Sequence, residues 1–357
     1  MPVRAGMVKS IISVSGKVLG MAYSIELLSE GNISRWEEFN DRSPEGTPFH
    51  GIRWKTILED ALKLRLRYYL IRDGGRVIGI SPFMEQTVGF LRGLNSIPHS
   101  EFNNMILDAS FDPGRLGEIL SLFAEDYSFL HFNTYRPEII AEIKRNNFTV
   151  EHTGNMVSDL KQKPPEVIWG SFSRNMRYSI QIFEKRGFRI QEVRDPAEVG
   201  RFYRYYVENL THINGDILPF SFFERLLELF PDEVRVATLT NGDVFAGGLL
   251  IMAPPGRTTA YYQYLALNRD LPNRYTPTYP LYWNLVNWAW ENGYEKISFG
   301  RQKLEPENPR MQSKVKFGAE HVPIHARLVP LSKTVSLAYQ VKRKLSALQP
   351  AYASTAR

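Results

Sequence analysis

The sequence predicts an α/β or α+β protein made of two domains that repeat one order of elements. Its 357 residues exceed the size at which a single hydrophobic core usually keeps growing. Apolar residues make up 43% of the chain and aromatic residues 13%, which is enough for well-buried cores. Two hairpin signals, Asp73-Gly74-Gly75 and Asn241-Gly242-Asp243, lie at corresponding places in a similar succession of strands and helices. The chain is therefore expected to hold two copies of one plan.

Periodicity and capping residues place the elements of the first copy. Strands are expected at residues 23–27, 68–72, 77–83, 105–107, 129–133 and near Phe148, and helices at 34–39, 54–64, 116–124 and 137–146.

The second copy follows a linker, Lys161-Gln162-Lys163-Pro164-Pro165, whose paired prolines continue neither a helix nor a strand. After it, a helix over 174–186, a strand near 188–193 and helices over 197–210 and 220–229 precede strands at 234–239, 245–252 and 258–267, a helix over 281–291 and a strand at 296–299. The expected units are 1–22, a leader, 23–160 and 161–331, the two domains, and 332–357, a basic helix and tail.

Composition excludes several kinds of site. The chain has no cysteine, so disulfides, thiolate nucleophiles and cysteine-bound metals are ruled out. No stretch approaches the roughly 20 apolar residues that a membrane span needs, and a cytoplasmic protein without integral membrane insertion is expected. Arg4 and Lys9 before an apolar run faintly resemble a signal peptide, but Gly16 and Lys17 interrupt it. A disordered leader, or initiation at Met21, accounts for that start better.

The charge of +6 is concentrated between residues 161 and 194. There the cations are Lys161, Lys163, Arg174, Arg177, Lys185, Arg186, Arg189 and Arg194, against Glu166, Glu184 and Glu192. On a helix capped by Ser173 and ended by Gly187, Arg174 and Arg177 lie on one polar stripe. That stripe is either a solvated helix face or a contact for phosphates. The basic helix over 333–348 is likewise either docked on its domain or held at a membrane surface.

A second group of polar residues follows the strand at 296–299. Gly300 lets backbone approach a ligand, Arg301 comes next, and Lys314 and Lys316 would share one side of a strand beginning at Ser313. Two ammonium groups there would suit an oxyanion or a phosphate, or would merely solvate an edge strand. The nearby tyrosines, among them Tyr262 and Tyr264, either pack in the core or line a pocket.

Metal chemistry and nucleotide chemistry lack their usual signals. His321 and His325 have Pro323 between them in an expected strand, so no metal site is expected. The phosphate-binding loop, the serine nucleophile elbow and the dinucleotide fingerprint are all absent from the sequence.

Three segments together resemble the FemAB-like branch of the GNAT superfamily of acyltransferases. They are Pro48-Phe49-His50 to Trp54 with Asp73 to Gly79, the Arg174 to Gly187 helix, and Phe299-Gly300-Arg301 with Lys314-Val315-Lys316-Phe317-Gly318. The resemblance implies tandem GNAT-like domains, each a mixed, mostly antiparallel sheet flanked by helices. By position it makes Lys314 the residue that stabilises negative charge on the carbonyl. Ser313 and Gln302 stand where the family has phenylalanine and serine.

The resemblance further implies transfer of an acyl or aminoacyl group to an amine of a cell-envelope precursor or sugar nucleotide, with polysaccharide biosynthesis as one setting. Arg301, Lys316, Gly300, Arg174, Arg177, Tyr262 and Tyr264 are the expected substrate-binding residues. No cofactor is expected to bind tightly, because the acyl donor is itself a substrate. Residues 268–279, where acyl-CoA enzymes carry a glycine-rich pyrophosphate loop, contain no glycine, which favours aminoacyl-tRNA over acyl-CoA.

Two rival functions remain open. One is a plain acyl-CoA N-acyltransferase. The other is a non-catalytic protein that binds tRNA or a glycan through the basic helix over 174–186, and steep salt dependence of RNA binding would mark it. For either acyltransferase function, the expected location is the cytoplasm, with peripheral attachment to the inner face of the membrane as an alternative. The residues do not identify a general base or an oligomeric state.

Overall fold

The computed structural model describes residues 23–102, 105–142, 148–149, 153–272, 275–305 and 307–338. The expected leader over 1–22 and most of the C-terminal basic segment lie outside these ranges, although residues 333–338 are helical. Among the described helices none is long and apolar enough to cross a membrane.

In its described residues the first lobe contains seven strands and four α-helices, which follow the expected order except for a strand at residues 91–95 that was not predicted. They are β1 (Tyr23–Leu27), α1 (Ile33–Arg42), α2 (Ile52–Leu62), β2 (Leu66–Asp73), β3 (Arg76–Val88), β4 (Leu91–Asn95), β5 (Ile106–Leu107), α3 (Leu116–Leu122), β6 (Phe129–Thr134), α4 (Pro137–Glu142) and β7 (Phe148–Thr149). Gly74 takes φ +54° in the β2–β3 hairpin, as its turn requires.

The second lobe repeats this plan. Its elements are β8 (Thr153–Asp159), α5 (Pro165–Ser171), α6 (Arg174–Lys185), β9 (Arg189–Val193), α7 (Pro196–His212), α8 (Phe220–Leu229), β10 (Val234–Asn241), β11 (Val244–Met252), β12 (Thr259–Leu267), α9 (Thr278–Glu291), β13 (Lys296–Lys303), α10 (Pro309–Lys316) and β14 (Ala319–Pro330). The hairpin predicted at Asn241-Gly242-Asp243 joins β10 to β11.

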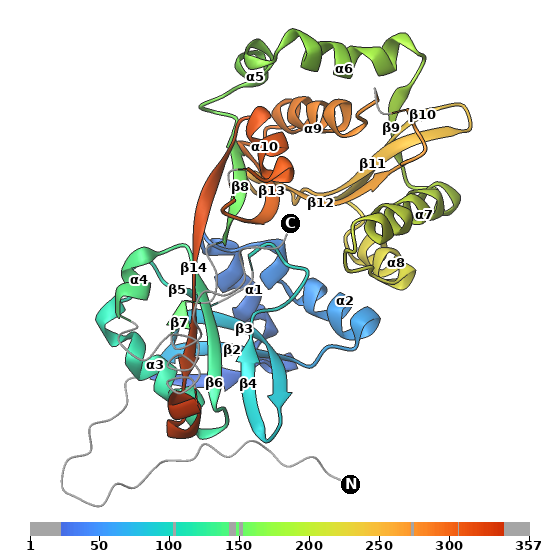
Figure 1. The fold of residues 1–357 in the computed structure, drawn as a ribbon. Coiled ribbons are helices and arrows are strands. Elements are labelled where there is room, and N and C mark those ends of the chain that lie inside the picture. Colours follow the sequence, from blue (N-terminus) through green and yellow to red (C-terminus); the bar gives the residue numbers. More distant parts are fainter. Residues whose placement is uncertain are drawn as a thin grey trace, which may run out of the picture.

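Strand pairing confirms the repetition. In each lobe a run of antiparallel strands ends in one parallel pair, β4 with β6 in the first lobe and β12 with β13 in the second. Each parallel pair is connected through a helix, α3 in one lobe and α9 in the other, as parallel strands require. The predicted mixed, mostly antiparallel sheets flanked by helices are thus present in both lobes (Figure 1).

The last strands cross between the lobes. β8, which precedes the expected boundary at residues 160 and 161, pairs with β13 of the second lobe. β14 pairs with β8 along residues 319–324 and with β6 of the first lobe along 325–330, so the two sheets become one continuous path. Figure 1 shows β14 running from the upper lobe to the lower one. The domain boundary at residues 160 and 161 therefore remains a prediction. β8, which precedes this boundary, lies in the sheet of the second lobe.

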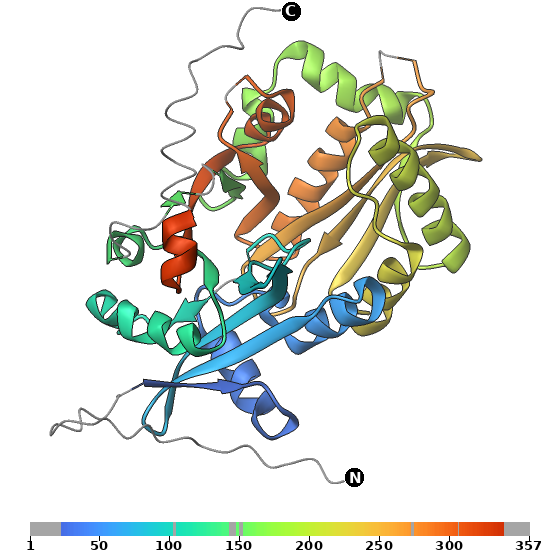
Figure 2. The ribbon, with the colours of Figure 1, turned by 60° about the horizontal axis from the view of Figure 1, so that its bottom comes forward.

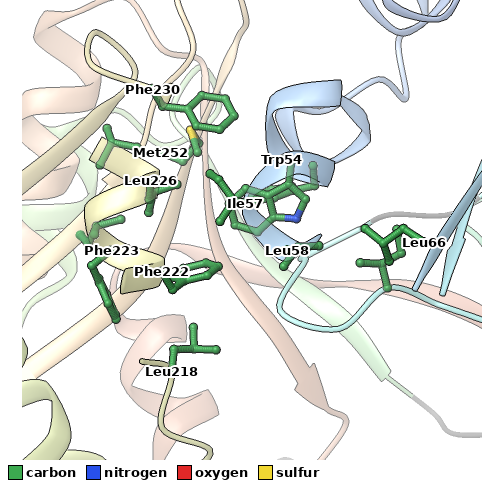
Figure 3. Packing of buried hydrophobic residues seen from close by; sticks show 14 of the residues in the cluster. Trp54, Ile57, Leu58, Leu66, Leu218, Phe222, Phe223, Leu226, Phe230 and Met252 are labelled. Atoms are coloured by element: carbon green, nitrogen blue, oxygen red, sulfur yellow. The ribbon is translucent and has the colours of Figure 1, made fainter. Parts of the chain in front are cut away.

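A shared hydrophobic core holds the lobes together. Trp54 of α2 contacts Phe222 of α8 edge to face, with ring centroids 5.8 Å apart, and both rings are fully buried. The same core includes Ile57, Leu226 and Phe230 (Figure 3). Both ribbon views place α2 beside α8 (Figures 1 and 2). Burial of these large side chains fixes the angle between the lobes, and hence the geometry of whatever lies between them.

One predicted element is wrong. Residues 313–316 were expected to begin a strand, but they belong to helix α10. Asn308 caps this helix by accepting a hydrogen bond from the N–H of Arg310, and Pro309 occupies the first turn. Gly318, with φ +81°, lies just past its end. These start and stop signals outweigh the alternation of lysine and apolar residues on which the strand was based.

Candidate active site

The parallel pair in the second lobe separates and leaves a gap. β12 and β13 pair only at residues 259–261 and 296–298. Beyond Ser298 the register of β13 against β8 shifts, and Gly300 takes φ +81°, a conformation that a residue with a Cβ adopts at a cost. The following residues of β13 consequently diverge from β12, and their backbone groups are available to side chains from elsewhere.

A cavity of about 610 Å³ occupies this gap and reaches the first lobe. Its walls come from β12, from β13, from α7, from α10 and from the loop that follows β4, which contributes His99, Ser100 and Glu101. Four of the predicted site residues, Gly300, Arg301, Tyr262 and Tyr264, line it together with Lys314. Clefts of this size that are built from two lobes are common binding sites.

Lys314 is buried in this wall, with 6% of its surface exposed. Its Nζ donates a hydrogen bond to the carbonyl oxygen of Phe299 and lies 5.8 Å from the ring centroid of Tyr262. Burial lowers the pKa of Lys314 to about 8, the nearby Glu101 carboxylate opposes that shift, and the Arg310 charge adds to it. The ammonium group of Lys314 is therefore desolvated and can lose its proton slightly above neutral pH, and the backbone of β13 holds it in place.

Glu101 enters the cavity from the first lobe, and the sequence interpretation missed it. Only 7% of its surface is exposed. Its Oε1 accepts a hydrogen bond from Nε2 of Gln263 at 3.2 Å, whereas Oε2 is buried without a hydrogen-bond partner among the described residues. Burial raises the pKa of Glu101 to about 8, against the lowering effects of the neighbouring Ser298 hydroxyl and of Lys314. A carboxyl group with such a pKa can accept a proton near neutral pH.

Aromatic residues of the first lobe position the loop that carries Glu101. Nε1 of Trp54 donates to Oγ of Ser100 at 2.8 Å, and the Thr47 hydroxyl donates to the carbonyl oxygen of Phe102 at 3.3 Å. The ring of Phe102 lies 4.1 Å from that of Tyr135, centroid to centroid. Trp54 thus supports the loop before Glu101, and Thr47 and Tyr135 support it after Glu101.

Arg301, which lines the cavity, and Lys316, which does not, have different hydrogen-bond partners. Nε of Arg301 donates to the Thr153 hydroxyl at 3.0 Å, which directs it along β8. Lys316, two residues after Lys314 on the helix, is exposed, does not line the cavity and donates to the Tyr279 hydroxyl at 3.0 Å. The two lysines therefore do not share a side, contrary to the strand-based expectation.

The basic stripe lies elsewhere in the second lobe. α6 begins at the predicted cap, where Oγ of Ser173 accepts from the N–H of Met176. Arg174 is exposed and Arg177 is half-buried, and neither lines the cavity. Nη2 of Arg177 donates to the carbonyl oxygen of Gly170 at 2.9 Å. Any role of this stripe in phosphate binding is separate from the cleft and remains a prediction.

No metal centre is formed by the described part of the chain, where no three His, Asp or Glu side chains gather into a ligand set. His321 and His325 both lie on β14, but His321 is opposite β8 and His325 is opposite β6. They therefore belong to pairings in different lobes.

Comparison with known protein families identifies the type of domain in the second lobe. Residues 170–307 match the family described as an acetyltransferase (GNAT) domain. This segment is a GNAT domain. The match ends before α10, so Lys314 lies outside the matched residues, whereas Gly300 and Arg301 lie inside them. A search of curated protein sequences finds no match.

Solved structures extend the GNAT fold to both lobes. A structure of FemX aligns with a TM-score of 0.63 and 12% identity, over 89% of this chain and 99% of that one. A tandem GNAT protein from the clavulanic acid biosynthesis pathway aligns at 0.55 and 10%, over 87% and 99%. The C-terminal domain of a putative lysylphosphatidylglycerol synthetase from Agrobacterium fabrum aligns at 0.54 and 12%, over 88% and 96%.

These findings confirm a GNAT domain and the class of acyltransferase, and the solved structures confirm the tandem GNAT fold and a likeness in fold to FemX. At such low identity the solved structures establish the fold, and acyl transfer rests on the GNAT domain itself. A GNAT enzyme binds its acyl donor and its acceptor as substrates.

Proposed function

We propose that the chain transfers an acyl or aminoacyl group to an amine carried by a cell-envelope precursor or a sugar nucleotide, and that the cleft between the lobes is where this happens. The observation that carries the proposal is the convergence of Lys314 and Glu101 on one cavity at the gap between β12 and β13. One residue is a buried cation and the other a carboxyl group with a raised pKa, and they come from different lobes.

The two side chains suit the two charge changes of acyl transfer. When an amine attacks the carbonyl carbon, negative charge develops on the carbonyl oxygen and positive charge on the amine nitrogen. The ammonium group of Lys314 would stabilise the oxyanion, and a desolvated charge does this more strongly than one in water. The ionised carboxylate of Glu101 would take the proton from the attacking nitrogen. Collapse of the tetrahedral intermediate then breaks the bond to the thiol or to the tRNA hydroxyl.

Aminoacyl-tRNA and acyl-CoA are both proposed as donors, and each places the reaction in the cytoplasm, where these compounds are made. Residues 268–279 contain no glycine, which disfavours a backbone cradle for CoA pyrophosphate and supports an aminoacyl donor. The fold shared with a protein named for lysylphosphatidylglycerol synthesis also supports such a donor. Recruitment of tRNA by the basic stripe around Arg174 and Arg177 is part of the same proposal.

Turnover by matched variants tests this function. The protein is incubated separately with labelled acetyl-CoA and with charged tRNA, each with a mixture of amine acceptors that includes amino sugars linked to nucleotides. Lys314→Met should lower the transfer rate by about a hundredfold or more, the scale of losing one oxyanion donor. Lys296→Met removes an exposed lysine at the opposite end of β13 and should leave the rate unchanged. Equal rates for both variants would refute the role of Lys314. Salt-sensitive RNA binding with no transfer from either donor would favour the non-catalytic alternative.

A further inference from the structure

The hairpin between β3 and β4 ends in a turn without a polar side chain. Val88 is the last residue of β3 and Leu91 the first of β4, and Gly89 and Phe90 lie between them. Phe90 is 84% exposed and Val88 is 53% exposed, and no other large apolar side chain in the described ranges is as exposed as Phe90. A hairpin turn in water ordinarily carries polar residues. This tip is therefore suited to an apolar environment rather than to water.

Cations gather at the base of the same hairpin. Lys63 and Arg65 are exposed in the connection from α2 to β2, and Arg67 follows on β2. These three residues border one depression of about 490 Å³. The N–H of Glu85 on β3 donates to the carbonyl oxygen of Arg65 at 2.8 Å, which joins this segment to the hairpin. Arg92, the second residue of β4, is also exposed. We call Lys63, Arg65, Arg67 and Arg92 the hairpin-base cations.

The hairpin-base cations outnumber the carboxylates that could neutralise them. Glu85 pairs with Arg67 at 2.7 Å and with Arg92 at 3.3 Å, so one carboxylate serves two guanidinium groups. Glu59, on the wall of the depression, pairs with a lysine of α2 instead. Asp126, which precedes β6, is exposed. The other two hairpin-base cations take part in no ion pair within the described part of the chain. The base of the hairpin consequently has an excess of positive charge.

The segment after β14 brings further cations to this end of the first lobe. The carbonyl oxygen of Ser128 accepts from the N–H groups of residues 331 and 332, and the N–H of Ser128 donates to the carbonyl oxygen of Arg92. The helical residues that follow therefore begin beside the hairpin, and Leu337 among them is 64% exposed. Figure 1 shows this red segment and the β3–β4 hairpin at the lower end of the first lobe. Residues 333–357 include five cations and no acid.

We propose that the β3–β4 hairpin docks on a lipid bilayer that contains anionic lipids, with Val88 and Phe90 in the interfacial region and the hairpin-base cations against the headgroups. Aromatic side chains favour that region, and each basic residue near an anionic surface adds to the attraction. RNA offers negative charge and stacking but no apolar medium for the aliphatic Val88. A second copy of the chain would bring the same positive charge to the contact. The docking concerns where the protein acts and does not depend on the chemistry proposed for the cleft.

Co-sedimentation of the full chain with vesicles tests the docking. Partition coefficients are measured on vesicles of equal parts phosphatidylglycerol and phosphatidylcholine and on vesicles of phosphatidylcholine alone. The wild type should bind the anionic vesicles at least about tenfold more tightly. Phe90→Ser should weaken this binding at least about tenfold, the scale of losing one inserted aromatic side chain, whereas Phe90→Trp should retain it. Tyr178→Ser is the matched control, because Tyr178 is a 56% exposed aromatic residue on α6, and its binding should be unchanged.

A pair of double variants tests the contribution of charge. Lys63→Gln with Arg65→Gln should weaken binding to the anionic vesicles about tenfold or more. Lys185→Gln with Arg186→Gln removes two exposed cations at the end of α6 and should leave this binding unchanged. Equal binding by the two double variants would refute the role of the hairpin-base cations. Melting temperatures equal to that of the wild type show that the replaced residues, all at the surface, do not act through folding.

Other results would also overturn the docking. It is refuted if the wild type does not sediment with anionic vesicles, or if Phe90→Ser binds them as tightly as the wild type. Dimers that form without vesicles and that Phe90→Ser abolishes would assign the tip to a second copy of the chain. Binding of single-stranded RNA that weakens in Phe90→Ser, with no binding to vesicles, would assign it to nucleic acid.

The variant Lys314→Met separates this inference from the proposed function. It should bind anionic vesicles as tightly as the wild type, because Lys314 is buried in the cleft and is not part of the hairpin. Vesicle binding by a wild type that transfers no acyl group would keep the docking and refute the proposed function. Transfer by a wild type that binds no vesicles would keep the function and refute the docking.

Discussion

Glu101→Gln is expected to make the protein more stable and less active, and the gain in stability should depend on pH. In the folded state the pKa of this carboxyl is about 8, whereas the unfolded chain has a value near 4.5. Between these two values the unfolded state has lost a proton that the folded state retains. The free energy of unfolding of the wild type therefore falls as pH rises from about 4.5 to about 8. Glutamine cannot ionise, so the variant escapes this loss.

The size of the effect follows from the shift. One pKa unit corresponds to about 1.4 kcal/mol, so the stability difference between variant and wild type should grow by about that amount per pH unit. It should reach about 3 kcal/mol at pH 7 and level off above pH 8. Structural relaxation or water entry around the carboxylate would make it smaller without changing its sign.

Chemical unfolding at pH 5, 6, 7 and 8 measures this difference. Glu208→Gln is the matched control, because Glu208 is exposed on α7 and its replacement should leave stability unchanged at every pH. A stability difference for Glu101→Gln that is the same at pH 5 and pH 8, or a variant that is less stable than wild type at pH 7, would show that the folded state does not raise the pKa of Glu101. A parallel transfer assay should show lower turnover in Glu101→Gln because the proton acceptor is gone.

The remaining predictions concern the cleft and its supports. A plot of the transfer rate against pH should be a narrow bell with its maximum near pH 8. Glu101 must lose a proton and Lys314 must keep one for transfer, and the pKa of each group is about 8. A rate that is flat from pH 6 to pH 10 would contradict this. Trp54→Phe removes the hydrogen-bond donor to Ser100 and should lower the stability by about 1 kcal/mol and the turnover number several-fold, as measured by thermal unfolding and transfer kinetics. Turnover equal to that of the wild type would show that this hydrogen bond does not position Glu101. Phe222→Ala should lower the free energy of unfolding by about 3–5 kcal/mol, because its ring is fully buried between the lobes; a loss below 1 kcal/mol in a urea titration would mean that the shared core contributes little.

Local signals made much of the fold predictable from the sequence. Gly74 and Gly242 fix two-residue hairpin turns, and each was visible as a glycine flanked by alternating apolar residues. The caps of α6 at Ser173 and Gly187 were likewise visible, as was Gly300, which lies at the register shift within β13. Each of these depends on the conformation of a few neighbouring residues, which the sequence determines directly.

Features that depend on distant parts of the chain were not predictable in this way. The pairing of β14 with both β8 and β6 joins segments about 170 and 195 residues apart, and no local pattern encodes such pairing. Glu101 lies on an irregular loop without a motif, and its importance comes from burial against the second lobe. The strand expected at Ser313 is wrong for a local reason, because Asn308 and Pro309 begin a helix there and the alternation of lysine and apolar residues does not override them.

The transfer rate of Lys314→Met, relative to the Lys296→Met control and to the wild type, decides whether Lys314 stabilises the oxyanion. It should be measured with whichever of acetyl-CoA or aminoacyl-tRNA the wild type uses, after thermal unfolding has shown that both variants are folded. Burial of Lys314 depresses its pKa, so exchange for methionine should not destabilise the fold. The rate should be at least about a hundredfold below wild type for Lys314→Met and unchanged for Lys296→Met. A folded Lys314→Met protein that transfers at the wild-type rate would contradict this role of Lys314.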